Sequence, residues 1–133
     1  MILDIGGEGR HPEAWNLNPR SRRTLGQQRG ELIPRLILGR GDCIPLADRT
    51  VDILIVERTP LREATLTEIL RVARPSARIV LRHANAHRRD PHRLAVQVLK
   101  GAVEQRTAMI ARQHVQETVI CLSLSLPPIS TAK

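Results

Sequence analysis

The residues best suited to ligand binding are the glycines that follow the first apolar run of the chain. Ile2–Ile5 includes one acidic residue, Asp4, and continues directly into Gly6-Gly7-Glu8-Gly9. Glycine tolerates a positive φ and has no Cβ, so such a loop lets backbone amides approach a ligand closely. A tight turn after an edge strand explains the same pattern, because a glycine loop alone is a weak motif. The stretch is therefore either a turn or a ligand-binding loop.

Two further carboxylates follow predicted strands. Asp42 comes after the apolar run 35–39, and Glu57 comes directly after the run 51–56. The carboxyl ends of parallel strands meet at one edge of a sheet, where ligands bind close to the reversal in strand order. We therefore expect both carboxylates to lie near the glycine loop. Glu57 is the candidate for a catalytic base or a substrate-positioning group.

Each acidic residue also has a purely structural interpretation. Asp4 lies in an apolar strand, where an unpartnered carboxylate is costly to bury, and loop amides could satisfy it. Asp42 could be an ordinary turn aspartate. Glu57 could form a salt bridge with Arg58 or Arg62. The sequence leaves these alternatives open.

The segment 82–93 is the densest run of charge, with four arginines and three histidines. The histidines lack the close spacing of metal ligands, so we predict no metal site. The segment follows a predicted strand and therefore faces the ligand edge. Its Arg88 and Arg89 could recruit a phosphate-bearing substrate, because guanidinium groups match phosphate geometry. A solvated surface is the alternative.

Length and composition indicate one domain, residues 1–126, followed by a polar tail, 127–133. The chain has 133 residues, of which 41% are hydrophobic, as is usual for a globular protein. It contains one Trp and no Phe or Tyr. This composition argues against RNA readers that stack bases on aromatic platforms. We interpret Trp15 as a core or interface residue.

The net charge of +8 comes from 21 Lys and Arg against 13 Asp and Glu. An anionic substrate or a nucleic acid is therefore a plausible partner, although a generally basic surface explains the charge equally well. Cys43 and Cys121 are far apart and no signal peptide is visible, so we expect reduced thiols in a cytoplasmic protein. No apolar run is long enough to span a membrane.

Hydrophobic patterning predicts strands that alternate with helices. Pro60 and Pro75 would bracket a helix at 59–74, in which Thr65 and Glu68 form a capping box. The link after Gly9 is too short for a parallel crossover with a normal helix, so the first helix is either absent or a stunted turn. The predicted strands are 2–5, 14–18, 35–39, 51–56, 77–81 and 115–126, and the helices are 59–74 and 90–113. This order favours an α/β sandwich with a largely parallel sheet.

The chain resembles class I S-adenosylmethionine-dependent methyltransferases from Ile2 to Leu81, and more weakly to Leu126. The blocks that carry the resemblance are Ile2–Gly9, Gly41–Leu46 with Val51–Val56, and Glu68–Pro75 with Arg78–Leu81. The resemblance implies a Rossmann-like three-layer sandwich with a mostly parallel sheet. The first helix is expected to be short or missing, and the last strand antiparallel.

The resemblance also implies roles for individual residues. The methionine part of S-adenosylmethionine would be held by the first loop, the ribose by the end of the second strand, and the adenine by the acidic turn. The implied cofactor residues are, in that order, Asp4, Gly6, Gly7 and Gly9; Asn18; and Asp42, Cys43 and Ile44. Substrate would contact Arg58, Thr59, Pro60, Arg88 and Arg89, with Glu57 as the catalytic candidate. Methyl transfer depends mostly on alignment, because the sulfonium is already activated.

The sequence also departs from the family pattern. The first helix is missing, the ribose position holds Asn18 instead of a carboxylate, and the turn before the fifth strand is Pro75-Ser76-Ala77. Two functions follow: a small methyltransferase with an unknown acceptor, or a non-catalytic module of the same fold that acts in binding or assembly. We also expect a homodimer, because a missing helix uncovers one sheet face.

Overall fold

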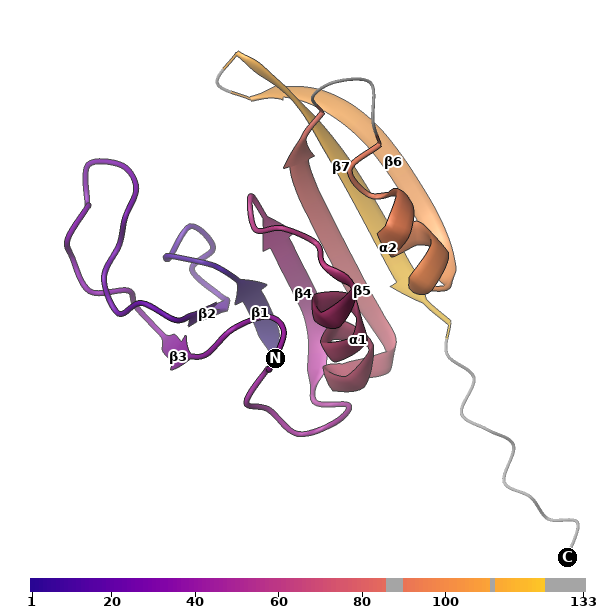
Figure 1. Ribbon diagram of the computed structural model, residues 1–133, viewed down its shortest axis with the longest axis horizontal. Coiled ribbons are helices and arrows are strands. Elements are labelled where there is room, and N and C mark those ends of the chain that lie inside the picture. Colours follow the sequence, from indigo (N-terminus) through magenta and orange to yellow (C-terminus); the bar gives the residue numbers. More distant parts are fainter. Residues whose placement is uncertain (86–89, 111, 124–133) are drawn as a thin grey trace, which may run out of the picture.

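The computed structural model describes residues 1–85, 90–110 and 112–123, which form one sheet of seven strands. The strand order is β3-β2-β1-β4-β5-β7-β6 (Figure 1). In chain order the elements are β1 (Ile2–Ile5), β2 (Trp15–Asn18), β3 (Leu36–Leu38), β4 (Val51–Glu57), α1 (Glu63–Val72), β5 (Ala73–Ala84), α2 (Arg93–Val98), β6 (Gly101–Ile110) and β7 (Gln113–Leu122).

Strands β1 to β5 run parallel, whereas β7 runs antiparallel to both of its neighbours, β5 and β6. This arrangement confirms the mostly parallel sheet and the antiparallel last strand. Strand order reverses between β1 and β4, where Asp4 pairs in register with Asn16 on one side and with Ile55 on the other. That reversal is the position at which an open α/β sheet offers a crevice.

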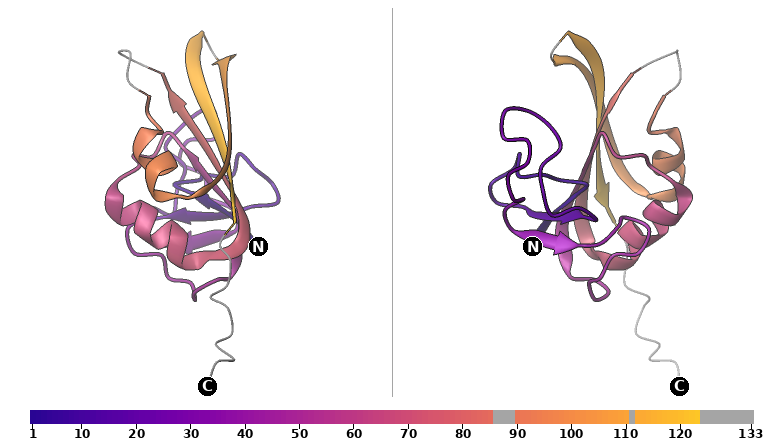
Figure 2. Two further views of the ribbon diagram at one scale, coloured as in Figure 1. Left: turned by 90° about the vertical axis from the view of Figure 1, so that its right-hand side faces the viewer. Right: turned by 60° about the vertical axis from the view of Figure 1, so that its left-hand side comes forward.

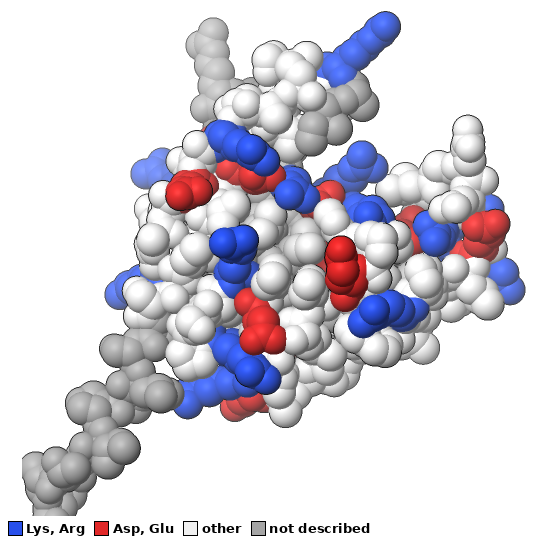
Figure 3. Space-filling model, turned by 180° about the vertical axis from the view of Figure 1, so that it is seen from behind, with Lys and Arg blue, Asp and Glu red and all other residues white. Residues whose placement is uncertain are grey.

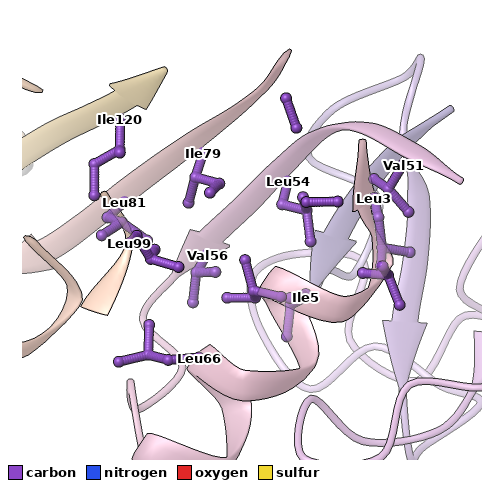
Figure 4. Close-up of a cluster of buried hydrophobic side chains, with 14 of the residues drawn as sticks. Leu3, Ile5, Val51, Leu54, Val56, Leu66, Ile79, Leu81, Leu99 and Ile120 are labelled. Atoms are coloured by element: carbon purple, nitrogen blue, oxygen red, sulfur yellow. The ribbon is translucent and has the colours of Figure 1, made fainter. Parts of the chain in front are cut away.

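Both helices lie against the same face of the sheet (Figure 2). Helix α1 turns Leu66, Ile69 and Val72 towards that face, where they are fully buried. They pack with alternate residues of the strands, among them Leu54 and Ile79, to form the main core (Figure 4). Burial of one large aliphatic side chain contributes about 1.5–3 kcal/mol, so this side of the sheet supplies most of the stability.

The other face carries no helix over β1 and β2, because residues 6–14 join these strands without one. The missing first helix is thus confirmed. The link lies over this face and covers Asp4 and Asn16, which are both buried. Further along the same face, Val80 and Val119 are only half-buried and Arg78 is exposed. Figure 3 views this face, where charged side chains of both signs surround uncharged surface.

Helix α1 begins later than predicted. Its N-cap is Arg62, which is still extended, so Pro60 lies in the preceding loop. The predicted capping box is also wrong: Thr65 is inside the helix, and Glu68 accepts hydrogen bonds from the Ile44 amide and from Arg71. The next strand follows immediately, since α1 ends at Val72 and β5 starts at the following residue, four residues before the predicted position.

The long helix predicted over 90–113 is wrong. Only Arg93–Val98 is helical, and Gly101–Ile110 forms strand β6, paired along its length with β7. The backbone of β7 passes close to Gly101, where an added Cβ would collide with the carbonyl oxygen of Cys121. Ladder pairing with β7 therefore overrides local helix propensity. The final strand ends at Leu122, and the predicted tail lies outside the described residues.

Among the described residues, no helix is long and apolar enough to cross a membrane.

The close approach at Gly101 gives a testable prediction. Replacing Gly101 with Ala should lower the free energy of unfolding by about 1–3 kcal/mol, because the added methyl group overpacks the β6–β7 hairpin. The exposed neighbour Ala102 provides the control, and Ala102→Val should change stability by less than about 0.5 kcal/mol. Urea unfolding followed by circular dichroism measures both. Equal midpoints for Gly101→Ala and the wild type would contradict the described packing.

Candidate functional site

A cleft of about 550 Å³ opens where the strand order reverses, at the carboxyl ends of β1 and β2. We call it the switch-point cleft. Side chains of Ile5 and Leu17 give it an apolar lining. Its polar lining comes from the loops that follow β1, β2, β3 and β4. The residues concerned are Gly6, Glu8, Asn18, Pro19, Arg20, Thr24, Gly39, Arg40, Gly41 and Thr59.

The glycine loop after β1 is packed tightly against its surroundings. Gly6 and Gly9 have φ values of 75° and 107°, which glycine adopts without strain. The amide of Gly6 donates to the Leu17 carbonyl at 2.7 Å, and the amide of Gly9 donates to Asn16 Oδ1 at 3.1 Å. A Cβ on Gly6 would collide with Thr59 Oγ1. These glycines therefore serve close packing first, and both amides are already engaged within the chain.

Asp4 is buried beneath the loop and forms a two-bond ion pair with Arg10. Arg10 Nε lies 3.2 Å from Asp4 Oδ2, and Arg10 Nη2 lies 3.1 Å from Asp4 Oδ1. Burial raises the pKa of Asp4, although the hydrogen bonds and charge of Arg10 act in the opposite direction. The carboxylate is thus held by the chain itself and not offered to a ligand.

Asn18 stands at the end of β2, inside the switch-point cleft, and only 6% of it is exposed. Its Nδ2 donates to the Gly7 carbonyl at 3.2 Å, and its Oδ1 accepts from the Arg20 amide at 2.9 Å. A side-chain amide has two donor hydrogens and two acceptor lone pairs. One donor and one acceptor of Asn18 remain beyond these bonds.

The acidic turn after β3 lies next to the switch-point cleft. Asp42 is exposed and lines a smaller cleft of about 200 Å³, which shares Arg40, Gly41 and Thr59 with the larger one. Its neighbours lie differently: Cys43 is exposed, whereas the side chain of Ile44 is buried in the core.

Glu57, at the end of β4, is the centre of a charge network. Its Oε1 accepts from His11 Nε2 and from Arg82 Nη1, each at 2.7 Å, and Arg10 Nε lies 3.5 Å from its Oε2. Burial alone would raise the pKa of Glu57, but the hydrogen bonds from His11 and Arg82 outweigh it and lower the pKa. The carboxylate is therefore kept charged, which makes it a weak base.

The network continues across the sheet. Arg82 also contacts Glu117 Oε2 at 2.6 Å, and Arg106 contacts Glu117 Oε1 at 2.7 Å. These side chains share one face because Glu57, Arg82, Glu117 and Arg106 are register neighbours on β4, β5, β7 and β6. The result is a row of alternating charge along the carboxyl edge of the parallel strands.

A second cavity of about 550 Å³ lies at the carboxyl end of β5; we call it the β5 cavity. Its lining residues are Glu57, Arg58, Pro60, Leu61, Arg82, His83, Ala84, Pro91, Gln113 and Val115. A third cleft connects the two cavities: it shares Gly6 and Thr59 with the switch-point cleft, and Glu57 and Arg58 with the β5 cavity. Two cavities of similar size therefore adjoin across residues 57–59.

No family model matches the sequence, and no curated protein matches it. Solved structures do match over most of their length. A SAM-dependent methyltransferase from Methanosarcina mazei is 15% identical, with a TM-score of 0.64 over 94% of this chain and 92% of that one. A methyltransferase from Thermotoga maritima, described as a possible histamine N-methyltransferase, is 13% identical, with a TM-score of 0.65 over 92% and 81%.

A third match is a variant 16S rRNA (adenine(1408)-N(1))-methyltransferase from Catenulisporales acidiphilia, with the cosubstrate SAM. It is 16% identical, with a TM-score of 0.56 over 94% of this chain and 86% of that one. The chain has the class I methyltransferase fold. This finding confirms the fold that the sequence blocks predicted.

The methyltransferase fold brings many of the predicted residues to one edge. Gly6, Asn18 and Thr59 line the switch-point cleft, and Arg58 and Pro60 line the β5 cavity. The predicted Arg88 and Arg89 lie outside the described residues. Sequence reasoning missed Arg10, His11 and Glu117. Only strand register shows their proximity to Glu57, so no local motif could have revealed them.

A chain of neutral side chains lies behind the β5 cavity. His83 Nε2 is 2.6 Å from the Thr59 carbonyl, which can only accept, so His83 Nε2 carries the proton. His83 Nδ1 must then accept from His92 Nε2, at 2.8 Å. His92 Nδ1 accepts in turn from Thr118 Oγ1, at 2.6 Å. One tautomer of each histidine is thereby fixed, and the chain positions Thr59 between the two cavities.

This histidine chain should make stability depend on pH. Burial lowers the pKa of His83, and burial with the neighbouring His83 lowers the pKa of His92 to about 4. The unfolded state therefore binds protons that the folded state does not, and stability should decrease as pH falls from about 6.5 towards 5. This window lies above the ordinary carboxylate range. Urea midpoints measured at a series of pH values test it.

Two variants provide the comparison. His92→Gln should flatten the pH dependence within this window, whatever its effect on absolute stability. The exposed His114 is the control, and His114→Gln should leave the slope unchanged. A slope in His92→Gln equal to that of the wild type would rule out His92 as a buried neutral group.

Proposed function

We propose that this protein binds S-adenosylmethionine in the switch-point cleft and transfers its methyl group to an acceptor in the β5 cavity. The observation that carries the proposal is the pair of similar cavities that adjoin across residues 57–59, at the strand-order reversal of a methyltransferase fold. One cavity would hold the methyl donor and the other the acceptor. Alignment of the two across a short boundary is the main requirement of the reaction.

The residues of the switch-point cleft fit such a cofactor. Ile5 and Leu17 offer an apolar surface, and the remaining donor and acceptor of Asn18 suit the hydroxyl groups of a ribose. Asp42 is exposed beside the cleft and suits the amino group of an adenine. Asn18 provides neutral hydrogen bonds where a carboxylate would bind more strongly. When bound, the cofactor supplies an activated methyl group on a sulfonium.

The acceptor side is formed by residues on the loop after β4. Arg58, Thr59 and Pro60 line the cavities on either side of the boundary. Glu57 suits substrate positioning better than proton abstraction, because His11 and Arg82 both stabilise its charged form. The predicted contribution of Arg88 and Arg89 to substrate binding stays a prediction. We also propose a cytoplasmic location, in keeping with two free cysteines.

One specific observation favours the non-catalytic alternative. The amides of Gly6 and Gly9 and the carboxylate of Asp4 are all engaged within the chain, so the glycine loop offers a ligand few free groups. A protein of this kind would keep the fold and use its surface for binding or assembly. Cofactor binding separates the two functions.

Calorimetric titration with S-adenosylmethionine and S-adenosylhomocysteine tests the proposal. The wild type should bind both, and Asp42→Ala should weaken binding by about 10-fold or more, the loss expected for a hydrogen bond to a charged group. Glu104→Ala, which removes an exposed carboxylate on the far edge of the sheet, should bind as the wild type does. Absence of binding for both ligands would reject the methyltransferase function. Binding without methyl transfer would support the non-catalytic module.

We further propose that a second copy of this chain covers the open sheet face. Val80 and Val119, half-buried on β5 and β7, form an apolar strip there, and an uncovered apolar face favours self-association. Sedimentation velocity at micromolar concentration should show a dimer that Val80→Asp converts to monomer. Val103→Asp, on the helix side of β6, should leave the dimer intact. A monomeric wild type would exclude this interface.

A further inference from the structure

The positive charge of the chain is concentrated in one segment. Residues 20–40, here called the arginine loop, contain six arginines and one acidic residue, Glu31, which is a formal charge of +5 out of the chain total of +8. The loop leaves β2, returns through β3 and continues to the residue after Gly39 (Figure 1). Its arginines are Arg20, Arg22, Arg23, Arg29, Arg35 and Arg40.

These arginines differ from the others in how they are paired. Within the described residues, the arginines that form ion pairs are Arg10, Arg71, Arg74, Arg82 and Arg106. No guanidinium of the arginine loop lies within ion-pair distance of a described carboxylate. All of them are exposed except that of Arg23, which is half-buried. The loop therefore presents positive charge that the described fold does not neutralise.

The loop is nevertheless held in place by hydrogen bonds. Glu8 accepts from the Thr24 amide at 2.9 Å, from Thr24 Oγ1 at 2.6 Å and from the Leu25 amide at 3.3 Å. Burial would raise the pKa of Glu8, but these hydrogen bonds lower it. An antiparallel bridge between Arg22 and Leu32 closes the base of the loop. The carboxylate nearest the arginines therefore holds backbone in place and leaves the guanidinium groups available.

The arginine loop also borders the candidate site. Arg20 and Arg40 line the switch-point cleft, and Arg23 lines the cleft that joins it to the β5 cavity. On the same side of the sheet, the guanidinium of Arg35 stacks over the Trp15 ring at 4.7 Å from its centroid. Trp15 is 36% exposed, so it is a surface residue and not the core residue expected from sequence. An anion bound along this loop would therefore pass the mouth of the cleft.

Spaced, unpaired guanidinium groups match the spaced phosphates of a nucleic acid, because each can bind a phosphate through two parallel hydrogen bonds. We propose that the arginine loop binds the phosphate backbone of a nucleic acid without sequence preference. The stack of Arg35 on Trp15 adds an aromatic face on which one unpaired base can rest. This inference does not rest on methyl transfer, and it places the nucleic-acid surface at 20–40 instead of at the 82–93 segment.

Fluorescence anisotropy with a labelled single-stranded RNA of roughly 16 nucleotides, and with a DNA duplex of the same length, tests the proposal. The logarithm of the binding constant should fall linearly with the logarithm of salt concentration between about 50 and 200 mM. The variant Arg20→Gln, Arg29→Gln, Arg40→Gln removes three guanidiniums that make no described side-chain hydrogen bond. For the single strand it should weaken binding by at least about 10-fold and reduce the salt slope by about 2.

A matched control removes equal charge elsewhere. Arg78, Arg93 and Lys100 are exposed and lie outside the arginine loop. Their triple replacement by Gln should retain most of the affinity and slope, whereas Arg20→Lys, Arg29→Lys, Arg40→Lys should retain binding because the charge is kept. Thermal unfolding shows whether each variant is folded.

Three outcomes would overturn the proposal. The first is absence of binding by the wild type at low salt. The second is an equal loss of affinity in the control, which would mean that only net charge matters. The third is displacement of the RNA by polyglutamate as effectively as by unlabelled RNA, which would indicate an acidic protein as the partner.

Discussion

The ion pair between Asp4 and Arg10 is the interaction on which the carboxyl edge of the sheet depends. A buried carboxylate without a partner would be strongly unfavourable, and Asp4 is fully buried in β1. Its partner is part of the link that stands in place of the first helix, so the ion pair fastens that link to the sheet. Arg10 also contacts Glu57, which joins the link to the charge network of β4, β5 and β7. The positions of the loops around both cavities follow from this one contact.

The sequence predicted those elements whose burial produces a clear pattern. Strand β4 is a continuous apolar run because both of its faces are largely covered, and Leu66 and Ile69 of α1 show helical spacing because one face packs on the sheet. Strand β6 gives no such signal. It is an edge strand whose side chains are mostly exposed, so it lacks the alternation of a half-buried strand, and chance spacing of apolar residues suggested a helix instead.

The candidate site was predictable in position but not in its bonding. A motif places Gly6, Asn18 and Asp42 near one another because parallel strands end at a common edge. It does not show that Asp4 and Asn18 already have partners, because Arg10 and Arg20 are recruited through loop conformation. The charge network is less predictable still, since Arg82 and Glu117 meet only through the antiparallel pairing of β5 with β7. The cavities thus combine a familiar position with an unusually self-contained lining.

The short link between β1 and β2 also has a consequence for how the chain folds. Parallel strands normally form late, because a long crossover must be ordered before they can pair. Here residues 6–14 are the whole connection, and closing so short a loop instead of one of about 30 residues lowers the entropic cost of closure by about 1 kcal/mol. The contact between Leu3 and Trp15 is thus nearly local in sequence. The loss of a helix makes this parallel pair a plausible nucleus, in which β1 and β2 associate before β4 completes the sheet.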